Sequence, residues 1–201
     1  MINKRILAIN GSYRTGGITD QVVEEILDEA RDLGADVEEI QLRDYPIEFC
    51  VNCRECMQQP GTAPGKCILN DGMAELIEKI EQADGFVLAA PTNFSAVTAI
   101  FKRFMERLSP YGYWPWGTNT PDFRKAKGPK KPAVIISSCA APALLGKLTY
   151  GTNQSLKVAA KTMGGKIVGN IVTGMISQEA AQELPKRARR KAQALAPKLA
   201  A

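Results

Sequence analysis

The sequence predicts an α/β fold: a doubly wound parallel sheet of five strands with helices on both faces. Two observations carry this prediction. Short apolar runs typical of buried strands alternate with longer segments whose apolar residues recur at helical spacing. Three of the strand-like runs end in turns of small or hydroxyl-bearing residues, which suit the connections from strand to helix in such a sheet. We expect one domain over residues 1–201, because no internal repeat or linker interrupts the pattern.

Five segments have the composition of strands. The first, residues 6–9, reads Ile-Leu-Ala-Ile and is expected to be buried. The second, residues 36–42, carries several acidic residues, which favours a position at one edge of the sheet. The other three are apolar runs at residues 85–90, 133–137 and 166–173.

Five helices are expected between and after these strands. The first covers residues 19–33, where apolar residues form a single stripe and Gly34 follows as a helix terminator. The last is basic and opens at Pro185, a residue favoured in the first turn of a helix. The full set is expected at residues 19–33, 71–83, 95–108, within 143–163, and 184–196.

Two segments follow neither pattern. An insert at about residues 44–70 is irregular and bears four of the five cysteines. A long loop at residues 109–131 holds a large share of the aromatic side chains: Tyr111, Tyr113, Trp114, Trp116 and Phe123. Long loops of this kind are often lids or contact surfaces, so we expect this loop to pack on a neighbouring subunit and help close a binding site.

Composition is that of an ordinary globular protein, with 45% apolar and 23% charged residues. No apolar run approaches the ~20 residues that a membrane-spanning helix needs, and the amino-terminal residues lack the layout of a signal peptide. We therefore expect a cytoplasmic protein that does not associate with a membrane.

The formal net charge of +5 hides an asymmetry between the two halves of the chain. Residues 1–100 contain 8 Lys or Arg and 17 Asp or Glu, whereas residues 101–201 contain 18 and 4. The basic residues are spread over helices and loops and are not interleaved with aromatic residues on one face, so we expect no nucleic-acid binding. A basic rim could instead attract a phosphorylated cofactor.

Histidine is absent from the sequence. Its absence excludes Ser/His and Cys/His nucleophile pairs and histidine-ligated metal sites, and it removes the most common general base. A bound cofactor is the simplest remaining source of chemistry.

The turn after the first strand has the residues of a phosphate-binding loop. Between residues 10 and 20, glycines alternate with the hydroxyls of Ser12, Thr15 and Thr19, Arg14 adds positive charge, and the helix N-terminus adds its dipole. The loop lacks the Gly-Lys-Ser/Thr of a P-loop and does not fit the G-x-G-x-x-G pattern of dinucleotide-binding folds. An ordinary strand-to-helix turn is the alternative interpretation.

Two further turns are expected beside this loop. They are residues 91–94, Pro-Thr-Asn-Phe, and residues 137–142, Ser-Ser-Cys-Ala-Ala-Pro. Ligands of doubly wound sheets bind at the carboxyl ends of the strands, near the point where strand order reverses. We therefore expect the three loops to converge on one ligand.

With these loops in place, the chain resembles the flavodoxin-like FMN reductase superfamily, and within it the iron–sulfur flavoproteins. Three stretches carry the resemblance: G-S-Y-R-T-G-G-I-T from residue 11, D-G-M-A-E-L-I-E-K-I-E-Q-A-D-G-F-V-L-A-A-P-T-N-F from residue 71, and K-R-F-M-E-R from residue 102. The resemblance implies the sheet order 2-1-3-4-5, FMN as the cofactor, NAD(P)H as co-substrate, and a homodimer or homotetramer.

The resemblance also implies residue roles. The FMN phosphate would be held by Ser12, Arg14, Gly17, Ile18 and Thr19, although relatives more often carry a polar residue at position 17 and asparagine at position 18. The isoalloxazine ring would be bracketed by Pro91, Thr92, Asn93 and Phe94 and bordered by Ser138, Cys139 and Ala140. No catalytic side chain is implied, because the flavin carries the chemistry.

Cysteine spacing in the insert indicates a metal or redox site. Cys50, Cys53 and Cys56 are three residues apart and can face one cluster, with Cys67 as a fourth ligand. From the residues alone, a cluster, a zinc ion, and free thiols or a disulfide all remain open. The resemblance implies a four-iron [4Fe–4S] cluster on these four cysteines, although the gap before Cys67 is longer than is usual in relatives.

We expect an FMN oxidoreductase that passes electrons between NAD(P)H or a reduced protein donor and a small-molecule or protein acceptor. Two alternatives stand beside it. One is an electron-transfer flavoprotein without turnover of its own, and the other is a thiol-based redox-sensing module without flavin.

Overall fold

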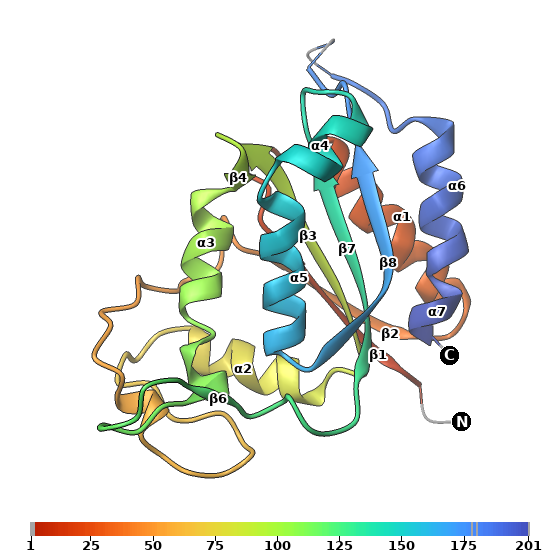
Figure 1. The fold of residues 1–201 in the computed structure, drawn as a ribbon. Coiled ribbons are helices and arrows are strands. Elements are labelled where there is room, and N and C mark those ends of the chain that lie inside the picture. Colours follow the sequence, from red (N-terminus) through yellow and green to blue (C-terminus); the bar gives the residue numbers. More distant parts are fainter. Residues whose placement is uncertain (1–2, 178, 180, 201) are drawn as a thin grey trace.

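The central sheet has the predicted order. The computed structural model describes residues 3–177, 179 and 181–200. Five parallel strands run in the order β2-β1-β3-β7-β8 (Figure 1), which confirms the predicted order 2-1-3-4-5. Their bounds are β1 Arg5–Asn10, β2 Asp36–Gln41, β3 Gly85–Asn93, β7 Lys131–Ser138 and β8 Gly165–Thr173. The acidic strand β2 lies at an edge, as its composition indicated.

Helices cover both faces of this sheet (Figure 1). Side chains of α2 (Met73–Gln82), α3 (Ala99–Glu106) and α5 (Thr152–Thr162) pack on one face together with Leu7 and Ile9 of β1. Side chains of α1 (Ile18–Asp32), α6 (Lys186–Leu195) and α7 (Pro197–Ala200) pack on the other face. Successive residues of a strand point to opposite faces, so the continuous apolar runs of the central strands supply both cores.

The helix expected at residues 95–108 begins later than predicted. Phe94 and Ser95 adopt left-handed backbone angles, with φ of 47° and 63°, and turn the chain into the short strand β4 (Ala96–Val97). Two consecutive left-handed residues are typical of a tight hairpin turn, and β4 pairs antiparallel with the end of β3. α3 then starts at Ala99, capped by Thr98, whose hydroxyl accepts the Phe101 amide at 3.3 Å.

The helical segment expected within residues 143–163 consists of two helices. α4 covers Ala143–Thr149, and α5 starts at Thr152. At the break, the Gly151 amide donates to the Ser95 carbonyl at 2.8 Å, so the junction of α4 and α5 packs beside the β3–β4 hairpin.

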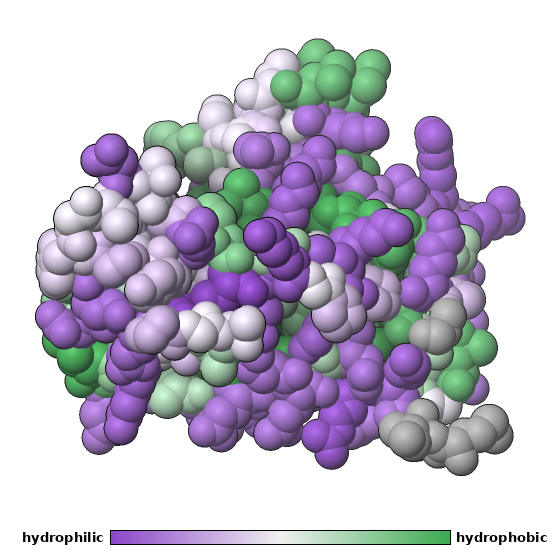
Figure 2. Space-filling model, turned by 60° about the horizontal axis from the view of Figure 1, so that its bottom comes forward, coloured by the Kyte–Doolittle hydropathy of each residue, from purple (hydrophilic) through white to green (hydrophobic). Residues whose placement is uncertain are grey.

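The insert and the aromatic loop lie together at the end of the sheet opposite the carboxyl ends of the strands, at the bottom of Figure 1. The insert contains one turn of 3-10 helix, η1 (Glu55–Met57). The loop contains η2 (Ser109–Tyr111), β5 (Gly112–Tyr113) and β6 (Asp122–Phe123). In Figure 2 polar side chains cover most of this end, and weakly polar side chains gather on the left.

Contacts within the chain hold the aromatic loop on the insert. The Trp114 amide donates to the Met57 carbonyl at 2.9 Å, and the Gly65 amide donates to the Pro110 carbonyl at 2.9 Å. The buried guanidinium of Arg124 donates to the carbonyls of Pro110, Gly61 and Gln59 at 2.7–2.9 Å. The loop therefore has short elements and contacts within its own chain, where the sequence predicted a loop without secondary structure; its packing on a neighbouring subunit stays a prediction.

No helix among the described residues has both the length and the apolar composition required to cross a bilayer.

Candidate functional site

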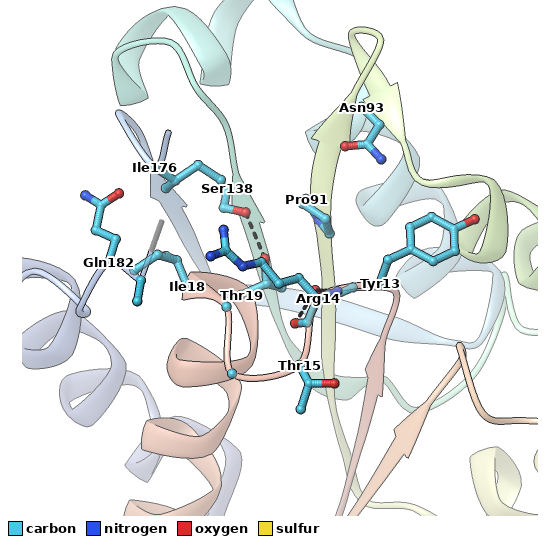
Figure 3. Close-up of a pocket in the computed structure, with 14 residues that line it drawn as sticks. Tyr13, Arg14, Thr15, Ile18, Thr19, Pro91, Asn93, Ser138, Ile176 and Gln182 are labelled. Atoms are coloured by element: carbon cyan, nitrogen blue, oxygen red, sulfur yellow. Dashed lines mark hydrogen bonds between the residues drawn. The ribbon is translucent and has the colours of Figure 1, made fainter. Parts of the chain in front are cut away.

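A cavity of about 320 Å³ lies at the carboxyl ends of β1, β3 and β7, where the three loops were expected to converge (Figure 3). Eight of the twelve residues predicted to bind the cofactor line it: Ser12, Arg14, Gly17, Ile18, Thr19, Pro91, Asn93 and Ser138. The fold thus brings residues separated by more than a hundred positions into one wall.

The N-terminus of α1 opens onto this cavity. Its cap residue, Gly17, has no side chain to accept the first amides, and among the described residues no side chain caps this end. Asp20 in the first turn binds elsewhere, accepting from the Asn10 side chain at 2.8 Å and from the Gly16 amide at 3.0 Å. Uncapped amides and the helix dipole together favour an anion.

Hydroxyl groups complete this end of the cavity. Thr19 Oγ1 lies 2.8 Å from Ser138 Oγ, and both side chains are buried. Ser12 Oγ accepts the Arg14 amide at 3.2 Å and donates to the Arg14 carbonyl at 3.1 Å, which fixes the turn. The Arg14 guanidinium has neither an ion pair nor a hydrogen bond with any described residue, and it extends over the cavity (Figure 3).

A polar cluster beneath the loop was missed by the sequence analysis. Asn10 is fully buried, and its amide nitrogen donates to Asp20 at 2.8 Å and to Glu39 at 3.0 Å. Arg43 donates to the Ser12 carbonyl at 3.1 Å and pairs with Asp20 at 3.3 Å. Burial raises the pKa of the Glu39 carboxyl, because its charged form is poorly solvated there. Arg43 thus neutralises the Asp20 carboxylate in the first turn of α1.

The remaining four predicted residues do not line this cavity. Thr92 turns its hydroxyl to Thr152 at 2.8 Å, and Phe94 is fully exposed at the tip of the hairpin. Cys139 is buried with its thiol donating to the Ala141 carbonyl at 3.3 Å, and Ala140 is exposed outside the wall. Contacts from these four to a ring that extends beyond the cavity stay a prediction.

Other residues of the wall escaped the sequence analysis. Tyr13 belongs to the turn between β1 and α1, and Ile176, Ala181 and Gln182 reach the cavity from the segment after β8. The segment is placed by backbone contacts, in which the Ile176 amide donates to the Cys139 carbonyl at 3.4 Å. No sequence motif marks that segment, so only the fold could reveal it.

All four insert cysteines line a second cavity, of about 310 Å³. Their thiols are free, and left-handed backbone angles at Asn52 and Arg54 wrap the Cys50–Cys56 turn around this cavity. Burial raises the pKa of the Cys56 thiol to about 11, and the neighbouring Cys67, Cys50 and Cys53 add to the shift. The three neighbouring thiols influence the pKa of Cys56 because they lie near it around the same cavity.

The donor set determines which group this second cavity can hold. Among the described residues, no three His, Cys, Asp or Glu side chains are grouped closely enough to share a single metal ion. A four-iron cluster is a larger body that is held by four separate thiolates, and four cysteines around one cavity fit that requirement.

Two arginines lie close to the insert cysteines, Arg54 within the segment and Arg107 at the end of α3. Arg54 lies 4.0 Å from the ring centre of Trp114 and 4.3 Å from that of Trp116, so two aromatic faces hold it. Arg107, which has a side chain 1% exposed, pairs with Asp71 and donates to Cys67 Sγ at 3.6 Å. Burial acts to raise the pKa of the Asp71 carboxyl, but hydrogen bonds from Arg107 and from the Glu48 and Met73 amides outweigh it and lower that pKa.

Comparison with known proteins agrees with this geometry. Residues 4–172 match the family model described as NADPH-dependent FMN reductase, a range that covers the turn after β1, the insert and all five central strands up to Val172. The chain belongs to the NADPH-dependent FMN reductase family. This membership confirms the predicted superfamily.

Relatives of this FMN reductase family member include two archaeal proteins named iron–sulfur flavoproteins. The protein from Archaeoglobus fulgidus is 32% identical over 111 residues, 55% of this chain and 48% of the relative. The protein from Methanocaldococcus jannaschii is 33% identical over 106 residues, 53% of this chain and 52% of the relative. The matched stretch thus spans about half the length of each of these relatives.

A solved structure supports the fold of the FMN reductase family member. An FMN-dependent NADH-azoreductase from Bacillus anthracis, in complex with FMN, has a TM-score of 0.70 with this chain. The comparison covers 98% of this chain and 100% of that one at 14% identity, a level at which only the fold is shared.

Proposed function

We propose that this chain is an NAD(P)H-dependent oxidoreductase that binds FMN in the cavity at the N-terminus of α1. The observation that carries the proposal is the uncapped helix end facing a cavity with buried hydroxyls and the free Arg14 guanidinium. Bound there, FMN would supply the two-electron and one-electron chemistry that this histidine-free chain lacks.

The protein's own residues would bind and orient the cofactor. The amides at the start of α1, the hydroxyls of Ser12 and Thr19, and the Arg14 guanidinium would hold the phosphate. Backbone N–H groups near Pro91 and Asn93 would face the ring, where hydrogen-bond donors stabilise the anionic reduced flavin.

Turnover tests this function. Purified protein loaded with FMN should oxidise NADPH or NADH in the presence of a quinone, and comparing the two nucleotides gives the preferred donor. Negligible oxidation of both nucleotides, with FMN bound, would favour an electron-transfer flavoprotein without turnover of its own. A colourless protein that cannot be loaded with FMN would favour a thiol-based module and contradict the proposal.

We further propose that Cys50, Cys53, Cys56 and Cys67 hold a four-iron cluster. Support comes from the four thiols around one cavity and from relatives named iron–sulfur flavoproteins. Anaerobically purified protein should contain about four iron atoms per chain, as expected for one cubane, and show broad brown absorbance beneath the flavin bands. Protein without iron after anaerobic incubation with iron and sulfide would contradict this assignment and leave the flavin proposal standing.

Self-association, as a homodimer or homotetramer, is also proposed. Several large apolar side chains are exposed on α4 and on the hairpin whose Ser95 carbonyl accepts the Gly151 amide at the α4–α5 junction: Leu144, Leu145 and Leu148 of α4, and Phe94 of the hairpin. Exposed apolar side chains of this size favour a protein contact. Size-exclusion chromatography at micromolar concentration should give an oligomer, and a monomer would contradict the proposal.

The five free cysteines favour a reducing compartment such as the cytoplasm.

A further inference from the structure

Arg107 is a buried cation that contacts one of the four insert cysteines. Arg107 is the residue that directly follows α3 and caps its carboxyl end, and its side chain is 1% exposed. The insert and the carboxyl end of α3 lie together at the lower left of Figure 1. One nitrogen donates to the Glu48 carbonyl at 2.8 Å, and both nitrogens bind the Asp71 carboxylate. The second nitrogen also donates to Cys67 Sγ at 3.6 Å.

Asp71 fixes the guanidinium in turn. Its carboxylate accepts the Glu48 amide at 2.7 Å and the Met73 amide at 3.0 Å, in addition to the fork from Arg107. The pair joins the insert, the start of α2 and the end of α3. A bidentate pair of this kind is rigid, so the donor that it directs at Cys67 is held in place before any group binds.

We propose that Arg107 is a positioning residue that orients Cys67 and sets the reduction potential of the group bound by the four cysteines, with Asp71 as the opposing charge. The inference rests on the proposed four-iron cluster. Hydrogen bonds to ligand sulfurs and net charge around a cluster are two determinants of its potential. One-electron reduction of a cluster held there would add one negative charge near Cys67, and the fixed cation of Arg107 would stabilise that reduced state.

Substitutions at Arg107 and at Asp71 should therefore shift the midpoint potential of the cluster in opposite directions. Arg107→Gln removes the cation and the sulfur donor and leaves the Asp71 charge, so the midpoint potential should become more negative. Asp71→Asn removes the opposing charge, leaves Arg107 in place and can still accept a backbone amide, so the potential should become more positive. Arg107→Lys keeps the charge without the fork and should give a value between those of the wild type and Arg107→Gln.

The experiment is a dithionite titration of the FMN-loaded, iron-reconstituted protein, with the cluster followed by electron paramagnetic resonance. Lys102→Gln is the matched control, because it removes one positive charge from the same helix at a side chain that is 59% exposed. This control should leave the cluster potential unchanged. Iron content is measured for every variant, and where Arg107→Gln fails to fold, Arg107→Lys and Asp71→Asn carry the test.

Opposite shifts in the Arg107 and Asp71 variants are expected, since a merely structural role would lower iron content in both without this change of sign. Shifts in the same direction, or potentials equal to the wild type, would overturn the inference while the cluster proposal stands. A wild-type protein that takes up no iron would overturn the cluster proposal and this inference together, and would leave flavin binding untouched.

Discussion

The hydroxyls of Thr19 and Ser138 lie 2.8 Å apart in the buried wall between α1 and β7, although 119 positions separate them in the sequence. The contact ties the N-terminus of α1, the proposed phosphate site, to the end of the fourth central strand, β7. Because both hydroxyls are buried, each depends on the other for a hydrogen bond when no ligand is present.

Removal of either hydroxyl of this pair should destabilise the protein. In flavin-free protein, Thr19→Val or Ser138→Ala should each lower the free energy of unfolding by about 1–3 kcal/mol, because the remaining hydroxyl is left buried without its partner. The double variant should lose less than the sum of the two single losses. Denaturant unfolding of all four proteins measures this coupling, and strictly additive losses would show that the two hydroxyls do not interact.

Arg43 should support cofactor binding without contacting the cofactor. Arg43→Met removes the donor to the Ser12 carbonyl and leaves the Asp20 carboxylate uncompensated near the phosphate site. We expect FMN to bind about tenfold or more weakly, the effect of losing an interaction worth about 1.5–3 kcal/mol. Arg31→Met, which removes an exposed cation from the other end of α1, is the control for net charge. Equal affinities in the Arg43 and Arg31 variants would contradict the role of Arg43.

The raised pKa of Glu39 predicts a pH dependence of stability. A carboxyl with a raised pKa in the folded state stabilises the fold below its unfolded pKa, and this contribution is lost as the pH rises through the folded value. Glu39→Gln should therefore lessen the decline in stability from mildly acidic to neutral pH. Unfolding free energies of both proteins from pH 4 to pH 8 measure the difference. Parallel pH profiles for the two proteins would show that Glu39 is not a source of the pH dependence of stability.

Gly146 should tolerate no side chain while Cys139 is present. A Cβ at position 146 would lie 2.3 Å from Cys139 Sγ, so Gly146→Ala forces α4 away from the end of β7. We expect a loss of about 1–3 kcal/mol, typical of overpacking. Cys139→Ala removes the obstructing sulfur, and the double variant should regain most of the loss. A double variant as unstable as Gly146→Ala would show that the clash with Cys139 Sγ is not the cause of the loss.

The fold could be predicted because local pattern determines it. Apolar runs that alternate with helical stripes leave few arrangements other than a doubly wound sheet, and the strand order followed from the resemblance. The hairpin at Phe94 and Ser95 could not be predicted, since it relies on left-handed backbone angles at residue types that rarely adopt them.

The turn at residues 10–20 was predicted from its own residues to bind phosphate, and it does line the cavity, but the side chains that support it were not predicted. Asn10, Asp20 and Arg43 lie on three separate elements, and nothing in the sequence relates them. Tyr111 shows the same limit. It was assigned to a loop expected to pack on a neighbouring subunit, but its side chain is fully buried within this chain, where its hydroxyl donates to Glu81 at 3.1 Å, and burial beside this carboxylate raises its pKa.

The most direct test of the account is a fluorescence titration of flavin-free protein with FMN and with riboflavin, which lacks the phosphate. The variant Arg14→Gln/Thr19→Val removes two of the proposed phosphate contacts. The account predicts that this variant binds FMN at least tenfold more weakly, while its affinity for riboflavin stays within about twofold of the wild type. Unchanged FMN affinity, or an equal loss for both flavins, would contradict the placement of the phosphate at the N-terminus of α1.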